Sequence, residues 1–184
     1  MDVAIILDTS GSGQYNQVIE VNINLARQIV LGLPIGPSRA AVGVIAIGNG
    51  ANVSFYLNAY NAKSDILNAL SFHISTGSYG LQNAFQSLTT DFFGAAHGGR
   101  IGGKQAAIVI TNSDTPFDYS GIVSAASAAR NAMIEVFAVA IGDGPNMAMI
   151  NAIVSNSTAN HTYTATSSND VNLVASNLLD ILCV

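Results

Sequence analysis

Residues 2–12 read DVAIILDTSGS, and this stretch decides the predicted fold. Positions 3–7 are all apolar, which is typical of a strand that is covered on both faces in a parallel sheet. A half-exposed antiparallel strand would instead alternate apolar and polar residues. We therefore expect further buried strands along the chain, with helices between them that cover the sheet.

Short apolar runs bounded by turn residues predict four more strands, at 42–47, 53–56, 107–111 and 136–141. Between these runs apolar residues recur at helical spacing, which predicts amphipathic helices. The recurring positions are Val18, Val21, Leu25 and Ile29, then Leu81, Phe85 and Leu88, and then Ile122, Ala126 and Ala129. Residues 63–70 and 171–182 predict a short helix and a closing helix.

Alternating strands and helices with right-handed crossovers predict an α/β fold. The expected architecture is a doubly wound, mainly parallel central sheet with helices on both faces. No linker or internal repeat interrupts the series, so residues 1–184 are predicted to form a single domain. Ligands of such sheets bind at the carboxyl ends of the strands, and we expect the functional site there.

Composition excludes several classes of function. The chain has 184 residues, of which 49% are hydrophobic and only 9% charged, and this excludes intrinsic disorder. A net charge of -5 without a Lys/Arg cluster argues against nucleic acid as a partner. The apolar runs are much shorter than the roughly 20 residues that cross a bilayer, so no membrane insertion is expected. The sequence shows no signal peptide, as expected of a mature product or an excised domain.

Three oxygen-bearing residues follow the first strand at alternate positions: Asp8, Ser10 and Ser12. In extended backbone such residues project to the same side, and neighbouring glycines let the chain curve so that the oxygens converge. Converging hard oxygens favour Mg²⁺, Mn²⁺ or Ca²⁺. Taken alone, the same string is also typical of a helix N-cap, because Asp and Ser accept backbone N–H bonds there.

The whole chain resembles the von Willebrand factor type A family, which includes the integrin inserted domains. After DVAIILD, the segments VGVIAIGNGANVSFYLN, ILNAL, AAIVITNSD and EVFAVAIGDG match the family's later strands and short helix in order. Members carry a metal-ion-dependent adhesion site (MIDAS) built from a DxSxS string, a threonine in a second loop and an aspartate after the fourth strand. The resemblance implies metal-binding roles for Asp8, Ser10 and Ser12.

The remaining MIDAS positions depart from the family pattern. In the second loop, spacing favours Ser75 as the ligand and residue type favours Thr76, and either supplies a hydroxyl oxygen. Asn112 stands where the family has aspartate. An amide oxygen brings no charge, so Asp8 is the only certain carboxylate of the site, and Asp114 is a candidate to compensate.

By the same resemblance, a glutamate or aspartate from a partner would complete the metal's ligand shell. The leading hypothesis is therefore a secreted, extracellular module for adhesion or matrix-protein binding. A metal-independent structural protein that self-associates in a matrix or filament is the first alternative, and low surface charge favours it. An intracellular scaffold subunit is the second. The closing helix 171–182 corresponds to an element that moves in some members, but we interpret it here as a packed helix.

Nothing in the sequence indicates an enzyme. Gly98, Gly103 and Lys104 satisfy part of a phosphate-binding loop pattern, but they precede a predicted strand, and Gln105 replaces the required hydroxyl residue. The three histidines, at positions 73, 97 and 161, lack the spacing of a zinc site, and no serine sits in a GxSxG elbow.

Two kinds of covalent modification are also predicted. Asn52, Asn156 and Asn160 begin Asn-x-Ser/Thr sequons, so they are glycosylation candidates in a secreted protein. Cys183 is the only cysteine, and it is either a candidate for a disulfide with a cysteine outside this segment or simply a small buried apolar residue. Either modification would argue against the intracellular hypothesis.

Overall fold

The structure is a computed structural model. It describes residues 1–10, 16–48, 50–70, 80–113, 119–155, 160–167 and 169–182, with the backbone alone for residues 16 and 17. The fold below refers to these residues.

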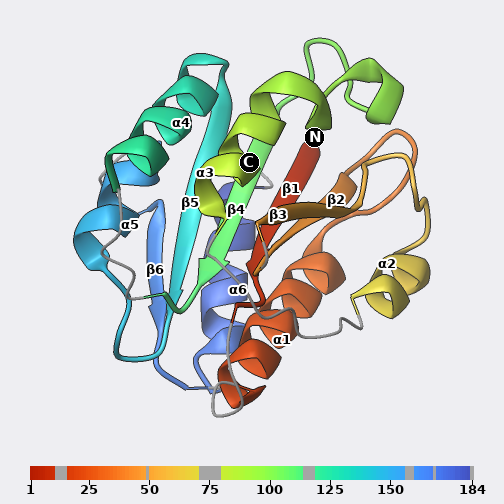
Figure 1. Cartoon of the computed structure of the whole chain (residues 1–184). Coiled ribbons are helices and arrows are strands. Elements are labelled where there is room, and N and C mark those ends of the chain that lie inside the picture. The colour runs from red at the N-terminus through yellow and green to blue at the C-terminus, as the bar shows by residue number, and fades with distance from the viewer. Residues whose placement is uncertain are drawn as a thin grey trace.

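The described strands form one six-stranded sheet (Figure 1). Its order is β3-β2-β1-β4-β5-β6. All neighbours run parallel except β3, which pairs antiparallel with β2. The strands are β1 (Asp2–Asp8), β2 (Ala41–Ile47), β3 (Ala51–Phe55), β4 (Gln105–Thr111), β5 (Ile134–Ile141) and β6 (Thr162–Ala165).

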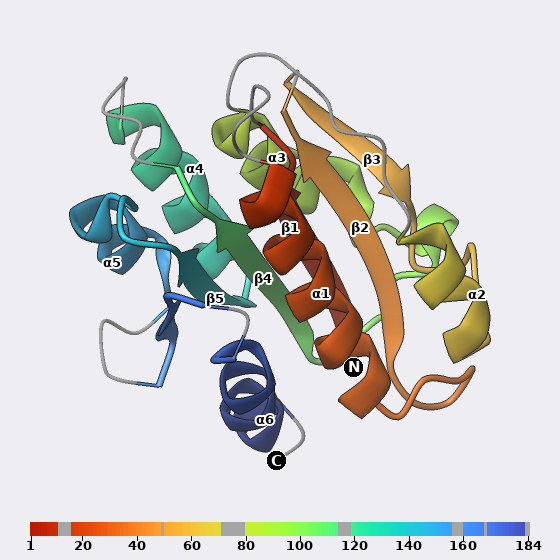
Figure 2. The ribbon, with the colours of Figure 1, turned by 90° about the horizontal axis from the view of Figure 1, so that it is seen from below.

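Helices cover both faces of the sheet (Figure 2). One layer contains α1 (Asn16–Gly32), α2 (Lys63–Ala69) and α6 (Val171–Leu182). The other contains α3 (Leu81–Ser87), which continues as a π-helical turn (Leu88–Phe92), with α4 (Tyr119–Asn131) and α5 (Met147–Ile153). A 3₁₀ turn, Ala95–His97, follows the π-helical turn. These layers confirm the predicted doubly wound α/β fold.

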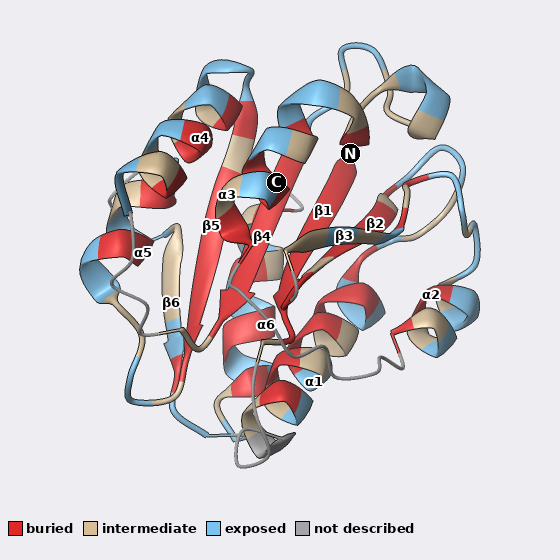
Figure 3. Ribbon diagram, viewed as in Figure 1, coloured by how far each residue is buried: buried red, intermediate tan, exposed pale blue. Residues whose placement is uncertain are grey.

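Strand β1 divides the interior into two cores. Val3, Ile5 and Leu7 pack against the layer of α1 and α6, while Ala4 and Ile6 pack against the layer of α3 and α4. All five side chains are fully buried, and the central strands are buried along almost their whole length (Figure 3). An apolar residue at every position is what a strand with two covered faces requires.

Three parts of the observed sheet and helices differ from the sequence prediction. The structure contains β6 and α5, which the sequence pattern does not predict. The strand predicted at 53–56 is observed two residues earlier at its start, as β3. It is an antiparallel edge strand whose Asn52 and Ser54 are exposed, so it lacks the continuous apolar run of the central strands.

The start of β1 is fixed by an ion pair between the buried Asp2 and the partly exposed Arg100. Asp2 is fully buried, and the Arg100 side chain binds its carboxylate, with Nε donating to Oδ1 at 2.7 Å. The backbone N–H of Arg100 donates to Oδ2 at 2.8 Å. The guanidinium also donates to the main-chain oxygens of Met1 and Arg39. Arg100 therefore ties the loop before β4 to the starts of β1 and β2.

Helices α1 and α6 end side by side on the side of the sheet where β1 and β2 start. A Cβ built on Gly32, the last residue of α1, would lie 2.1 Å from Cδ1 of Leu179 near the end of α6. Both α1 and α6 start near the carboxyl ends of the strands and run back across the sheet. Their last residues therefore lie on the side of the sheet where the strands start. None of the described helices is long and apolar enough to cross a membrane.

Candidate metal site

Asp8 ends β1 and forms the centre of the candidate site. It is fully buried, and donors from two segments occupy its carboxylate. Oδ1 accepts hydrogen bonds from the backbone N–H of Ser10 at 2.9 Å and from Ser10 Oγ at 2.5 Å. Oδ2 accepts a hydrogen bond from Thr111 Oγ1, at the end of β4, at 2.7 Å. The ends of two neighbouring parallel strands therefore converge on this carboxylate.

The electrostatics of Asp8 are unusual for a carboxylate. Burial raises its pKa above the ordinary value of 3.8, and hydrogen bonds from Ser10, Thr111 and the backbone N–H of Asn112 oppose the shift without cancelling it. Among the described residues, no Lys, Arg or His forms an ion pair with it. A buried negative charge of this kind is stabilised by a counter-charge, which a bound cation would supply.

The described donor set fits a hard divalent cation. Asp8 and the half-buried Ser10 bring a carboxylate and a hydroxyl oxygen together, and oxygen ligands are those that Mg²⁺, Mn²⁺ and Ca²⁺ prefer. Over the described ranges, no group of three or more His, Cys, Asp or Glu residues could hold a metal. Among the described residues, Asp8 is therefore the one carboxylate of the site.

Asn112 lies next to this centre. It directly follows β4, is half-buried, and bonds the Asp8 carboxylate through its backbone N–H. Its side-chain oxygen, however, faces a residue that the sequence pattern does not predict, Asn22 of α1. The signal for Asn22 is a polar residue on a helix face whose other members, Val18, Val21 and Leu25, are apolar.

Four predicted ligands lie outside the described residues, so the structure does not place their oxygens. These are Ser12, Ser75, Thr76 and Asp114. The structure does describe Gly80, the residue directly before α3. A Cβ on Gly80 would lie 2.1 Å from the carbonyl carbon of Gly50 and 2.2 Å from its oxygen. A residue with a side chain at position 80 would therefore force the backbone before α3 away from Gly50.

None of the other predicted features among the described residues bonds the Asp8 carboxylate. Of the glycosylation candidates, Asn52 on β3 and Asn160 before β6 are exposed, whereas Asn156 lies outside the described residues, as does Cys183. His97 stacks on Tyr56, and His161 stacks on Phe137. The loop with Gly98, Gly103 and Lys104 precedes β4 and opens no helix, as expected.

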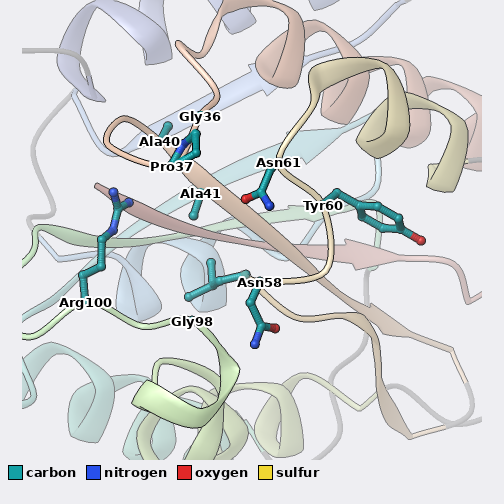
Figure 4. A pocket seen from close by; sticks show the side chains of 10 residues that line it. Gly36, Pro37, Ala40, Ala41, Asn58, Tyr60, Asn61, Gly98 and Arg100 are labelled. Carbon is teal, nitrogen blue, oxygen red and sulfur yellow. The ribbon is translucent and has the colours of Figure 1, made fainter.

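A surface pocket of about 220 Å³ lies on the side of the sheet where the strands start, opposite Asp8 (Figure 4). Arg100 is its only charged lining residue, and its guanidinium is already bound by Asp2 and two main-chain oxygens. The remaining polar side chains there are the amides of Asn58 and Asn61 and the hydroxyl of Tyr60. The pocket therefore offers a ligand little charge, and we do not assign it a function.

The strand order of this sheet, together with an acidic residue and hydroxyl groups at the end of its first strand, is typical of one class of binding domain. The von Willebrand factor type A domain model matches residues 2–177. The chain belongs to this family.

Relatives and solved structures agree with this family. The chain is 32% identical to the human collagen alpha-5(VI) chain over 144 residues, covering 77% of this chain and 5% of that protein. It is 29% identical to bovine integrin alpha-2 over 120 residues, covering 62% of this chain and 10% of that protein. It therefore spans only a small part of these relatives.

Among solved structures, proximal thread matrix protein 1 from the mussel byssus superposes with a TM-score of 0.84. The superposition covers 99% of this chain and 48% of that one, at 19% sequence identity. That structure has zinc in its MIDAS motif. At this identity the likeness shows the fold.

Proposed function

We propose that this chain is an extracellular protein-binding module of an adhesion or matrix protein that coordinates a partner's carboxylate through a divalent cation at Asp8. The observation that carries the proposal is the buried Asp8 carboxylate, which has no cationic partner among the described residues and lies beside the hydroxyl of Ser10. A cation there would neutralise Asp8 and keep an open position for a partner's aspartate or glutamate. The relatives support a matrix or adhesion setting, and the byssus structure supports a metal at this motif.

The proposed activity is recognition without chemistry. Asp8 is engaged by hydrogen-bond donors and a proposed metal, and we assign the chain no catalytic residue. The exposed Asn52 and Asn160 are suited to carry glycans in a secreted protein. Mg²⁺ is the cation that we expect, with Mn²⁺ or Ca²⁺ as substitutes, because hard oxygens surround Asp8.

A metal-independent, self-associating structural role is the second candidate, and one observation favours it. The chain has only six Lys and Arg residues, and at least four of them bind groups of the chain itself, among them Lys63, Arg100, Lys104 and Arg130. Few cations then remain to keep copies apart or to attract an acidic surface. An intracellular scaffold would share the fold, but no feature of the described residues favours it.

Cation titration of the EDTA-stripped chain, by calorimetry and thermal melting, tests the proposal. We expect saturable binding of Mg²⁺ and Mn²⁺ that raises the melting temperature, because a ligand that binds only the folded state stabilises it. Asp8→Ala should abolish both effects. Asp65→Ala is the matched control, because Asp65 is an exposed carboxylate on α2, and it should leave both unchanged.

Absence of binding at millimolar cation would contradict the metal-dependent proposal. In that case, sedimentation of the metal-free chain as oligomers at increasing concentration would support the structural alternative. A chain that neither binds cations nor self-associates would contradict both.

A further inference from the structure

Asn22 links α1 to the ends of two strands. Its side chain is fully buried, and Nδ2 donates to the main-chain oxygen of Asp8 at 2.9 Å and to Oδ1 of Asn112 at 3.3 Å. The Asp8 main-chain oxygen can only accept, so it fixes the orientation of the Asn22 amide. Turning that amide over would place its oxygen against the oxygen of Asp8.

The orientation of Asn22 fixes that of Asn112 in turn. Because Asn22 presents Nδ2, the Asn112 amide must present its oxygen to α1. The NH₂ group of Asn112 therefore faces away from Asn22, and within the described part of the chain no acceptor contacts it. An NH₂ group donates hydrogen bonds and does not ligate cations.

Packing alone does not account for Asn22. Its Oδ1 is buried and has no hydrogen-bond partner among the described residues. A buried acceptor without a donor destabilises a protein, and an apolar side chain of similar size would fill the position without that cost. The contribution of Asn22 therefore lies in its Nδ2, which touches both Asp8 and Asn112.

We propose that Asn22 is a positioning residue that holds the Asn112 oxygen away from the cation, so that position 112 acts as a hydrogen-bond donor at the site. The cation is then held without Asn112, and the Asn112 NH₂ group is available to the partner carboxylate that completes the metal's shell. This inference rests on the proposed function for its cation and partner. The orientation of the two amides can be tested without either.

The first experiment measures hydrogen exchange of the side-chain NH₂ groups by NMR in the metal-free wild-type chain. We expect the Asn22 NH₂ to exchange slowly, because it is buried and bonded, and the Asn112 NH₂ to exchange rapidly. A protected Asn112 NH₂ together with an unprotected Asn22 NH₂ would overturn the assignment of both amides. This measurement needs no variant and no metal.

The second experiment measures Mn²⁺ affinity of the wild type, Asn22→Leu, Asn112→Ala and the double variant. Asn112→Ala should change the affinity by less than about twofold, because Asn112 is not a ligand. Asn22→Leu frees the Asn112 oxygen, so affinity should rise at least about threefold, and the gain should vanish in the double variant.

A marked loss of Mn²⁺ affinity in Asn112→Ala alone would overturn the inference, because Asn112 would then be a ligand. If no protein of the set binds Mn²⁺, the proposed function fails, while hydrogen exchange still decides the amide orientation. If Asn22→Leu does not fold, the exchange experiment and Asn112→Ala remain decisive.

Discussion

At Asp8 the requirements of folding and of cation binding oppose each other. Burial raises the pKa of the Asp8 carboxyl in the folded chain, so the folded state favours its neutral form over its charged form. The stability that the carboxyl contributes is therefore fully present below its unfolded pKa. It is lost as the pH rises through the higher folded pKa. A bound cation would reverse this loss, because it favours the charged form.

Asp8→Asn should therefore raise the melting temperature of the metal-free chain at pH 7 by a few degrees, since it removes a buried charge but keeps an oxygen for Ser10. The same variant should lose all stabilisation by Mg²⁺. Thermal melting from pH 4 to pH 8 in EDTA checks the sign, because the advantage of the variant should grow with pH. A wild type that is the more stable of the two throughout this range would contradict the assignment.

Asn112→Asp should strengthen cation binding by about tenfold, because a second carboxylate adds charge to the ligand set. One oxygen of the new carboxylate can still accept from Asn22 Nδ2, which leaves the other for the cation. Calorimetry with Mg²⁺ measures the change. Asn61→Asp is the matched control. It adds the same charge at an exposed position on the side of the sheet opposite Asp8, so it should leave the affinity for Mg²⁺ unchanged.

At the scale of elements, close glycine contacts decide how helices approach the sheet. Gly80→Ala should destabilise the chain by about 2 kcal/mol, because its Cβ would meet backbone atoms of Gly50 and not the end of a side chain that can turn away. It should also weaken cation binding, since it displaces the start of α3 and the second loop. Denaturant unfolding and Mn²⁺ titration measure the two effects.

Gly32→Ala is the control for this prediction. The three atoms nearest to its Cβ would all belong to the flexible Leu179 side chain, which can shift, and alanine is a better helix former than glycine. We expect little loss of stability and no change in Mn²⁺ affinity. Equal losses in the two variants would show that the backbone contact at Gly80 is not decisive.

The elements also show what the sequence could and could not predict. The central strands were predictable, because burial on both faces demands an apolar residue at nearly every position, as in β1. Strand β6 has four residues, carries two threonines and lies at the sheet edge, so no apolar run reveals it. Helix α5 is only seven residues long, and its one clear signal is the cap in which Asn146 Oδ1 accepts from the backbone N–H of Met149 at 3.1 Å.

The candidate site was predictable in the same uneven way. The spacing of Asp8 and Ser10 after a strand indicates converging oxygens, and the structure brings these two together. Asn22 could not be assigned a role from sequence. Its partners come from β1 and from the end of β4, and only the packing of α1 across both strands brings them within reach.

At the scale of the whole molecule, the Asp2–Arg100 pair ties together segments that are far apart in sequence. Arg100→Ala should destabilise the chain by about 3 kcal/mol, because it leaves the Asp2 charge buried and unpaired. Removing both partners, as in Asp2→Asn with Arg100→Leu, should recover much of that loss. Urea unfolding of the two variants tests this. Equal losses would show that the charge of Asp2 is not the cause.

The ends of β1 and α6 also determine how the chain would respond to tension. Strand β1 begins on the side of the sheet opposite Asp8, and the last described helix, α6, ends on that same side. Helix α6 lies on the outside of one layer, against α1. β1 lies in the middle of the sheet and is hydrogen-bonded on both sides. A force applied between these two points would therefore first peel α6 from its layer, and β1 would yield last. Asp8 lies at the far end of β1 from the point where this force would act, so a partner could remain bound there while the module is stretched.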